Sequence, residues 1–368
     1  MTLQQSVRRA GYELGASCYQ LIQASLDDAD WFLGSAAGNG ATFSELFFHY
    51  TWPKKPPSGW QFSVYPIVDW RVDTNGAGEV LYDGYEFPIW DLLHLNQENV
   101  AKWIALFKLF PKHGLRLYLR LHDFCSLKDP FKKRHYPFEG RNIQHDTGKY
   151  SGGMFWAWSA DEDHPYGDPS KGGQITPYYA KGLRVLLSML AKAKVDFRII
   201  IMSEADYLAD GGDTEAKRDG KVILFHRWHI DQLYKMGVPK NRCMISTSRG
   251  LDKMAKWGHA MEIHGINSPE RLEDAVKNYP QLVMNRRIFP NGDGPDPNAK
   301  GRRGDAPTKR EPSVAQAGEM AALIRRYQMK RYAYFVRPCD TLWIPKMRAN
   351  SKVNYFDALL GLAEGVIK

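Results

Sequence analysis

The sequence predicts a single (β/α)8 barrel, the TIM-barrel class of α/β fold, with long loops after some of its strands. Short apolar segments and amphipathic segments alternate along the 368 residues. Eight strand–helix units in strict order are typical of a closed parallel sheet with helices outside it. A doubly wound sheet is the alternative, but the glycine-rich residues 34–40 precede a strand rather than opening a helix, as a dinucleotide-binding turn would. No long linker interrupts the pattern, so we expect one domain over residues 1–368.

Eight segments rich in apolar residues are the predicted strands. The third, LRLYLRLH, alternates strictly, so its leucines should face the helices and its other four side chains the barrel axis. The fourth, FRIIIMSE, is an apolar run that ends on Glu204. In chain order the segments occupy residues 12–22, 41–52, 115–122, 197–204, 242–248, 259–266, 281–289 and 331–338.

Helix signals lie between these strands. In NQENVAKWIALFKLFPKHG, apolar residues recur at helical spacing, Asn96 can cap the start and Gly114 can end the helix. Thr176 before Pro177 marks another start. The predicted helices occupy residues 26–40, 96–114, 176–194, 223–237, 251–258, 268–279, 313–330 and 354–367.

Three connections are much longer than usual, at residues 53–95, 123–175 and 288–313. Each follows a strand, so in a barrel all three lie on the C-terminal face, where active sites of this fold are built. The first contains WQFSVYPIVDW and EVLYDGYEF, which can pair as a β-hairpin inserted after the second strand.

Composition limits the partners. The formal charge of +9 favours an anionic partner, but no nucleic-acid-binding module is recognisable, so we expect no nucleic acid. The N-terminus lacks an apolar signal segment and no apolar run spans a membrane, which predicts cytoplasmic synthesis and leaves later release by lysis or within a virus particle open. The four cysteines form no CxxC pair and are expected to be reduced and buried. The oligomeric state is not predicted.

Two carboxylates at predicted strand ends are the candidate catalytic residues, Glu204 and Glu262. Glycoside hydrolysis uses two such groups, one as proton donor and one as nucleophile or base. Burial at the end of an apolar strand raises the pKa of a carboxyl group, as a proton donor needs. The competing interpretation for Glu204 is an ion pair inside the barrel, and Glu45 is expected to pair with Arg120.

The candidate sugar-binding residues have aromatic, imidazole or guanidinium side chains and are expected near the carboxyl-terminal end of the barrel. They are His122, His264, Arg120, Trp156, Trp158, Tyr334, Arg337 and Trp343. The first strand lacks the His-x-His of metal-dependent barrel hydrolases, so neither a metal nor another cofactor is expected.

The order of elements and three motifs resemble clan A glycoside hydrolases, the cellulase-like family 5-type barrels. The segment ending KHGLRLYLRLHD is similar to their second helix and third strand, IIIMSEADY to their fourth strand, and EIHGI to their sixth. The resemblance implies an acid/base role for Glu204 and sugar-positioning roles for His122 and His264.

The sequence departs from that pattern at the seventh strand. LVMNRRIF carries Asn285 and Arg286 where the resemblance implies a nucleophilic Glu. Glu262 is the expected substitute, with Asp206, Asp293 and Asp296 as stand-ins from loops. Two functions therefore stay open: a glycosidase acting on an oligo- or polysaccharide, which can be anionic, or a catalytically inactive carbohydrate-binding or virion assembly protein on a glycosidase-like barrel.

Overall fold

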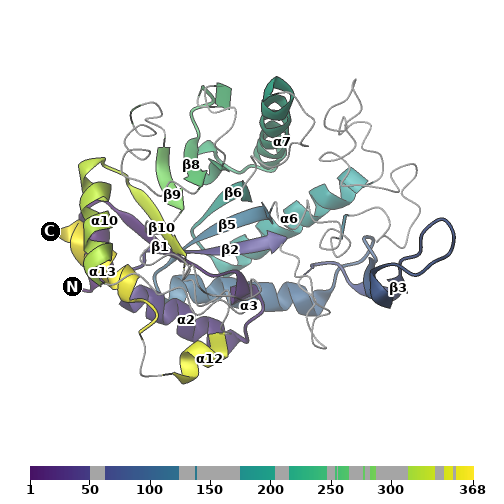
Figure 1. Ribbon diagram of the computed structural model, residues 1–368, viewed down its shortest axis with the longest axis horizontal. Helices are drawn as coiled ribbons and strands as arrows, with labels where there is room; N and C mark the ends of the chain where they lie inside the picture. Colours follow the sequence, from purple (N-terminus) through teal and green to yellow (C-terminus); the bar gives the residue numbers. More distant parts are fainter. Residues whose placement is uncertain are drawn as a thin grey trace, which may run out of the picture.

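The strands form a closed parallel barrel in the order β1-β10-β9-β8-β7-β6-β5-β2 (Figure 1). This computed structural model describes residues 1–49, 63–123, 137–138, 175–203, 215–246, 253–254, 256–264, 277, 282–286, 314–335, 344–350 and 354–368. Each predicted strand segment contains one barrel strand. The strands are β1 (Glu13–Ser17), β2 (Phe43–His49), β5 (Arg116–Asp123), β6 (Phe197–Ser203), β7 (Cys243–Ser246), β8 (Ala260–His264), β9 (Leu282–Arg286) and β10 (Arg331–Phe335).

Helices lie around the barrel as the amphipathic segments predict. They are α2 (Leu26–Gly38), α3 (Gln97–Lys112), α6 (Ile175–Ala193), α7 (Glu215–Lys235), α10 (Val314–Arg326) and α13 (Asp357–Ile367). The two signals at the ends of α3 are confirmed: the Asn96 side chain accepts from the Asn99 amide at 3.0 Å, and Gly114 has a φ of +64°. Of the helix predicted at residues 251–258, residues 253–254 are helical and residues 256–258 form a turn, and the helix predicted at residues 268–279 lies outside the described residues except for residue 277.

Two short helices were not predicted, α1 (Leu3–Arg9) and α12 (Ile344–Ala349). Helix α1 closes the amino-terminal end of the barrel next to α13, and the chain termini lie on the same side of the molecule (Figure 1). Gln4 Nε2 donates to the carbonyl oxygens of Ala41 at 2.7 Å and His113 at 3.2 Å, just before β2 and β5 begin. These bonds satisfy backbone groups at the end of the barrel.

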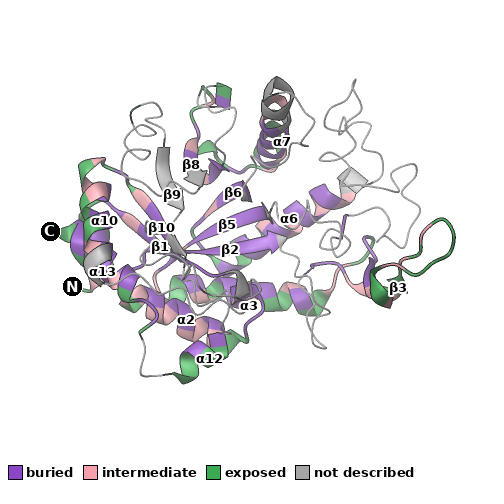
Figure 2. Ribbon diagram, viewed as in Figure 1, coloured by how far each residue is buried: buried purple, intermediate pink, exposed green. Residues whose placement is uncertain are grey.

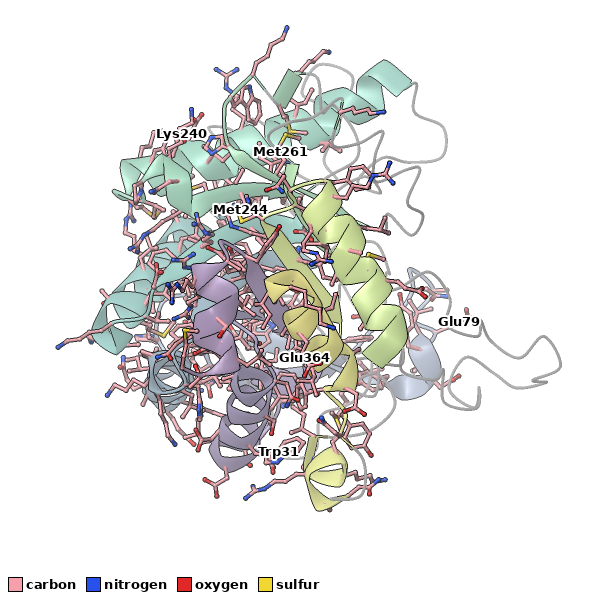
Figure 3. The ribbon with its side chains drawn as sticks, turned by 90° about the vertical axis from the view of Figure 1, so that its left-hand side faces the viewer. Trp31, Glu79, Lys240, Met244, Met261 and Glu364 are labelled. Atoms are coloured by element: carbon pink, nitrogen blue, oxygen red, sulfur yellow. The ribbon has the colours of Figure 1, made fainter. Side chains whose placement is uncertain are left out.

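The barrel interior is filled by large apolar side chains. Phe43, Tyr118, Ile200, Met244 and Ala333 form one buried cluster, in which the rings of Phe43 and Tyr118 stack with centroids 4.1 Å apart. The buried strands appear as one purple core in Figure 2, and Figure 3 places Met244 inside the molecule, well away from Glu79 at its edge. The cluster is a packed layer rather than a channel, as in other barrels of this size.

The strict alternation of β5 is confirmed on both faces as far as Leu121, whereas His122, also predicted to face the barrel axis, contacts side chains of α6 and α7. Its leucines at 117, 119 and 121 are buried in the outer core between the strands and the helices. Tyr118 lies in the inner cluster, and Arg116 and Arg120 bond to glutamates of β1, β2 and β8 across the barrel.

An ion-pair layer lies below the inner cluster, at the amino-terminal end of the strands. Glu13 pairs with Arg116 and accepts a hydrogen bond from the Tyr118 hydroxyl. Arg331 Nε lies 3.0 Å from the other side of the same carboxylate. This layer binds β1 to β5 and β10 with charged side chains that the barrel keeps largely from water.

A two-stranded antiparallel sheet follows β2, made of β3 (Ile67–Val72) and β4 (Glu86–Trp90). The predicted hairpin is therefore confirmed, with strands that start later than the sequence suggests. The hairpin projects from the barrel, and its outer strand is exposed in Figure 2.

The cysteine prediction needs correction. Cys243 is free and buried, as expected, but Cys18 is disulfide-bonded, and its partner lies outside the described residues. The separation of cysteines along the sequence gave no sign of this because barrel closure brings distant strand ends together. Among the described helices, none is long and apolar enough to cross a membrane.

Candidate functional site

The carboxyl-terminal ends of β5 and β6 form the centre of the candidate site. The parallel register pairs His122 with Met202 and Asp123 with Ser203. Glu204 follows Ser203 in the sequence and itself lies outside the described residues. Strand β6, which immediately precedes Glu204 in the sequence, thus ends beside β5 at the end of the barrel where active sites are built.

A buried ion-pair triad crosses the barrel below this point. Arg120 Nη2 lies 2.6 Å from Glu45 Oε1 and 2.7 Å from Glu262 Oε1, and none of the three side chains is exposed. Arg120 also lies over the ring of Phe47, 5.8 Å from its centroid. The triad joins β2, β5 and β8, which are not all neighbours in the sheet.

The carboxylates keep the buried guanidinium charged. Burial by itself lowers the pKa of Arg120, but the attraction of Glu262 and Glu45 and their hydrogen bonds raise it above its usual value. Two carboxylates on one guanidinium nitrogen are charge-assisted bonds, which are stronger than neutral ones. The triad is therefore a fixed internal brace.

A second buried polar cluster surrounds His122. Its Nε2 lies 2.7 Å from the hydroxyl of Tyr179 on α6 and 3.1 Å from Nε2 of His229 on α7. The Tyr179 hydroxyl lies 3.0 Å from the same His229 nitrogen. His122, Tyr179 and His229, here called the His–Tyr–His trio, have no exposed surface.

These contacts involve three of the predicted site residues. Glu262, Arg120 and His122 are each 0% exposed, so in this conformation none of them presents a surface to a sugar. The predicted Glu45–Arg120 pair is present, and Glu262 shares it. Arg120 and His122 are buried against other protein groups, Glu262 is an internal ion-pair partner, and the sugar-binding and catalytic roles expected of them stay predictions.

For the other predicted site residues the structure describes either the backbone alone or nothing. His264 on β8 and Tyr334 on β10 have described backbone positions, and their side chains are not described. Outside the described residues lie Glu204, Trp156, Trp158, Arg337 and Trp343.

Sequence reasoning missed Tyr179 and His229. One available signal was the spacing in HRWH, residues 226–229, because residues three apart on a helix share a face. Both histidines are buried, with His226 Nδ1 2.8 Å from the Val222 carbonyl oxygen and His229 Nδ1 2.8 Å from that of Phe225.

Strand β9 carries the departure noted in the sequence. Its register pairs Asn285 with Ile263 and Tyr332, and Arg286 with His264 and Ala333. The pairing of β8 with β9 shifts between Met261 and Glu262, an irregularity of the kind often found beside active sites. No Glu occurs within β9 itself.

The described part of the chain shows no metal site built from the usual protein ligands, which are His, Cys, Asp and Glu. There, no three His, Cys, Asp or Glu side chains gather as ligands. The trio contains two such residues and a phenol.

Solved structures with a similar fold include glycoside hydrolases. An endo-1,4-β-mannanase from Rhizomucor miehei matches with a TM-score of 0.54 and 10% identity, covering 96% of this chain and 94% of that one. A GH20 catalytic module of the pneumococcal exo-β-D-N-acetylglucosaminidase matches with a TM-score of 0.50 and 10% identity, covering 98% and 84%. At such identities the likeness shows the fold alone, a (β/α)8 barrel.

A candidate glycoside hydrolase from Bacteroides vulgatus matches 88% of the chain with 14% identity and a TM-score of 0.49, and this chain spans 51% of that protein's length. No family model matches the sequence, and no curated protein matches it.

Proposed function

We propose that the protein is a glycoside hydrolase acting on an oligo- or polysaccharide, with Glu204 as its proton donor. The position of Glu204, directly after the last residue of β6, carries the proposal. That position is the carboxyl end of a barrel strand, where catalytic groups of this fold stand. A carboxylic acid there can protonate the leaving oxygen of a glycosidic bond. The glycosidase-like fold adds support by analogy only.

The second carboxylate is assigned to a loop in this proposal. Glu262 already shares the buried Arg120 with Glu45, so its carboxylate braces the barrel. Asp206, Asp293 and Asp296 are the remaining candidates, and all three lie outside the described residues. A nucleophile or base must reach the anomeric carbon, which a carboxylate with 0% exposure does not.

The substrate is proposed to be anionic. The chain carries a formal charge of +9, and Arg286 lies on β9 near the carboxyl end of the barrel. Arg337 and the three predicted stacking residues, Trp156, Trp158 and Trp343, complete the proposed sugar contacts. Guanidinium groups bind carboxylates and sulfates of acidic sugars through paired hydrogen bonds.

A second candidate function is sugar binding without hydrolysis. Asn285 and Arg286 at the end of β9, in place of a Glu, favour it. The two functions share the barrel and the aromatic residues, and they differ in whether Glu204 transfers a proton.

One experiment separates them. Reducing-sugar release is measured over a panel of neutral and acidic polysaccharides for the parent protein, Glu204→Gln and Glu262→Gln, together with binding by calorimetry. The proposal expects release by the parent, a fall of about 10²–10⁴-fold in Glu204→Gln with binding kept, and lowered stability in Glu262→Gln. Binding without release by the parent would favour the second candidate.

A further inference from the structure

Strand β3 is the exposed outer arm of the hairpin that projects from the barrel (Figure 2). In the described part of the chain it pairs with β4 on one side only. Val68 is 45% exposed and Val72 is 39% exposed. The side chains of Asp69 and Arg71 are 54% and 61% exposed. A strand edge of this kind can accept a further strand.

The backbone of β3 offers hydrogen-bonding groups at this outer edge. Asp73, the residue after β3, accepts from the Leu81 amide of the other arm at 2.8 Å. Because alternate residues of a strand direct their backbone groups to opposite edges, Trp70 and Val72 direct theirs outward. The Trp70 amide accordingly donates to a local acceptor, the Asp69 side chain, at 2.8 Å.

The sequence of residues 68–72, VDWRV, is symmetric about Trp70. A valine lies at each end, and Asp69 and Arg71, which carry opposite charges, lie on either side of the centre. If two copies pair antiparallel about Trp70, Val68 lies opposite Val72 of the second copy, and Asp69 lies opposite its Arg71. Directly opposite side chains have Cβ atoms about 4.5–5.5 Å apart, and opposite charges at that spacing stabilise a sheet.

The charges also exclude the neighbouring registers. Pairing centred on Asp69 puts this carboxylate opposite its own copy, and pairing centred on Arg71 does the same with the guanidinium. Like charges directly opposite each other destabilise a sheet. An edge charged only to prevent association would gain nothing from this symmetric placement of opposite signs.

We propose that two copies of this protein associate through β3, forming one antiparallel sheet in the order β4-β3-β3-β4 with a two-fold axis at Trp70. Both copies contribute the same surface, so the interface is isologous and closes at a dimer. The Asp69–Arg71 ion pair, 3.1 Å within one copy, joins its counterpart in a group of four alternating charges. Dimer formation goes beyond the proposed glycosidase function and does not depend on it.

The paired edge is short, which limits the affinity. The register of β3 with β4 shifts between Ile67 and Asp69, so the regular edge begins only at Asp69. Such a contact buries less than the roughly 1,200 Å² of a standard interface. We therefore expect dissociation in the micromolar range and a monomer in dilute solution.

Sedimentation equilibrium of the full chain, from dilute to concentrated solution, measures the association. We expect a reversible monomer–dimer equilibrium for the parent. Asp69→Arg places a guanidinium opposite Arg71 of the second copy and should weaken dimer formation at least about 10-fold. The matched control is Glu364→Arg, which makes the same change in charge at an exposed position of α13 and should dimerise as the parent does.

Charge exchange locates the contact. Arg71→Asp places two carboxylates opposite each other and should also be monomeric alone. A mixture of Asp69→Arg and Arg71→Asp brings opposite charges together at both positions and should dimerise, as should the double variant with both changes. Circular dichroism identifies any variant that fails to fold. The inference is overturned if the parent stays monomeric at every concentration, if folded Asp69→Arg dimerises as tightly as the parent, or if the folded variants do not associate when mixed.

Discussion

Arg120 and Glu262 are bound to each other across the inside of the barrel, Nη2 to Oε1 at 2.7 Å, with neither side chain exposed to water. Glu45 binds the same nitrogen at 2.6 Å. A guanidinium that serves two carboxylates in a dry interior is costly to remove, because both anions then lose their shared cation.

Replacing Arg120 by Met should therefore destabilise the protein by about 3–5 kcal/mol, measured by urea unfolding. The matched control is Arg71→Met, whose ion pair with Asp69 is exposed on both sides, so its loss should leave the urea midpoint almost unchanged. Adding Glu45→Gln and Glu262→Gln to Arg120→Met should recover part of the loss. Equal effects of Arg120→Met and Arg71→Met would contradict the brace.

Gly15 is required by the ring of Phe43. The two residues are partners in the register of β1 and β2, and a Cβ on Gly15 would stand 2.1 Å from the Phe43 ring. Gly15→Ala should cost about 1–3 kcal/mol through overpacking of the barrel interior. Gly38→Ala, where nothing lies within 4 Å, should change stability by less than about 0.5 kcal/mol.

Phe43→Leu should restore part of the stability lost in Gly15→Ala, because the smaller side chain makes room. A double variant no more stable than Gly15→Ala alone would show that the ring is not the obstacle.

Glu13 should make stability depend on acid pH. Burial alone raises the pKa of this carboxyl group, but attraction to Arg331, the hydrogen bond from Tyr118 and attraction to Arg116 lower it below 4.5. A depressed folded-state pKa stabilises the protein above the unfolded-state value, and the contribution is lost as pH falls through the folded-state value.

The melting temperature of the parent should accordingly fall more steeply below pH 4.5 than that of Glu13→Gln. At neutral pH the variant should be the less stable of the two, since it lacks the charged partner of Arg116 and Arg331. Parallel melting curves for the two proteins across the acid range would refute the assignment.

Cys18 should be unreactive toward thiol reagents in the denatured, unreduced protein. Fewer than four cysteines should then be labelled, and all four of the sequence after reduction. Peptide mapping without reduction identifies the partner. Labelling of all four before reduction would show that no disulfide forms.

Local patterns predicted the elements that make the barrel. Strict alternation in residues 115–122 placed Leu119 outside and Arg120 inside, and Asn96 and Gly114 fixed the ends of α3, because these signals act within a few residues. The helix α1 was missed, although Thr2 and Gln5 form a capping box at its start. Seven residues are too few for a clear periodicity.

Contacts across the barrel were predicted less well. The Glu45–Arg120 ion pair joins neighbouring strands and was predicted. The ion pair between Glu262 of β8 and Arg120 was not predicted, because it forms only when the sheet closes into a barrel. His122 was expected to face a sugar, but side chains of two helices cover it. The packing of whole helices against the barrel determines which helix residues contact the end of a strand. A short sequence pattern does not predict those contacts.

The most direct test of the central claim compares two substrates with one variant. Glu204→Gln is assayed on a natural glycoside the parent hydrolyses and on an aryl glycoside of the same sugar whose phenol leaves without protonation. The account predicts a loss of about 10²–10⁴-fold on the natural glycoside and a much smaller loss on the aryl one. Equal losses on both, or full activity of Glu204→Gln on the natural glycoside, would contradict a proton-donating Glu204.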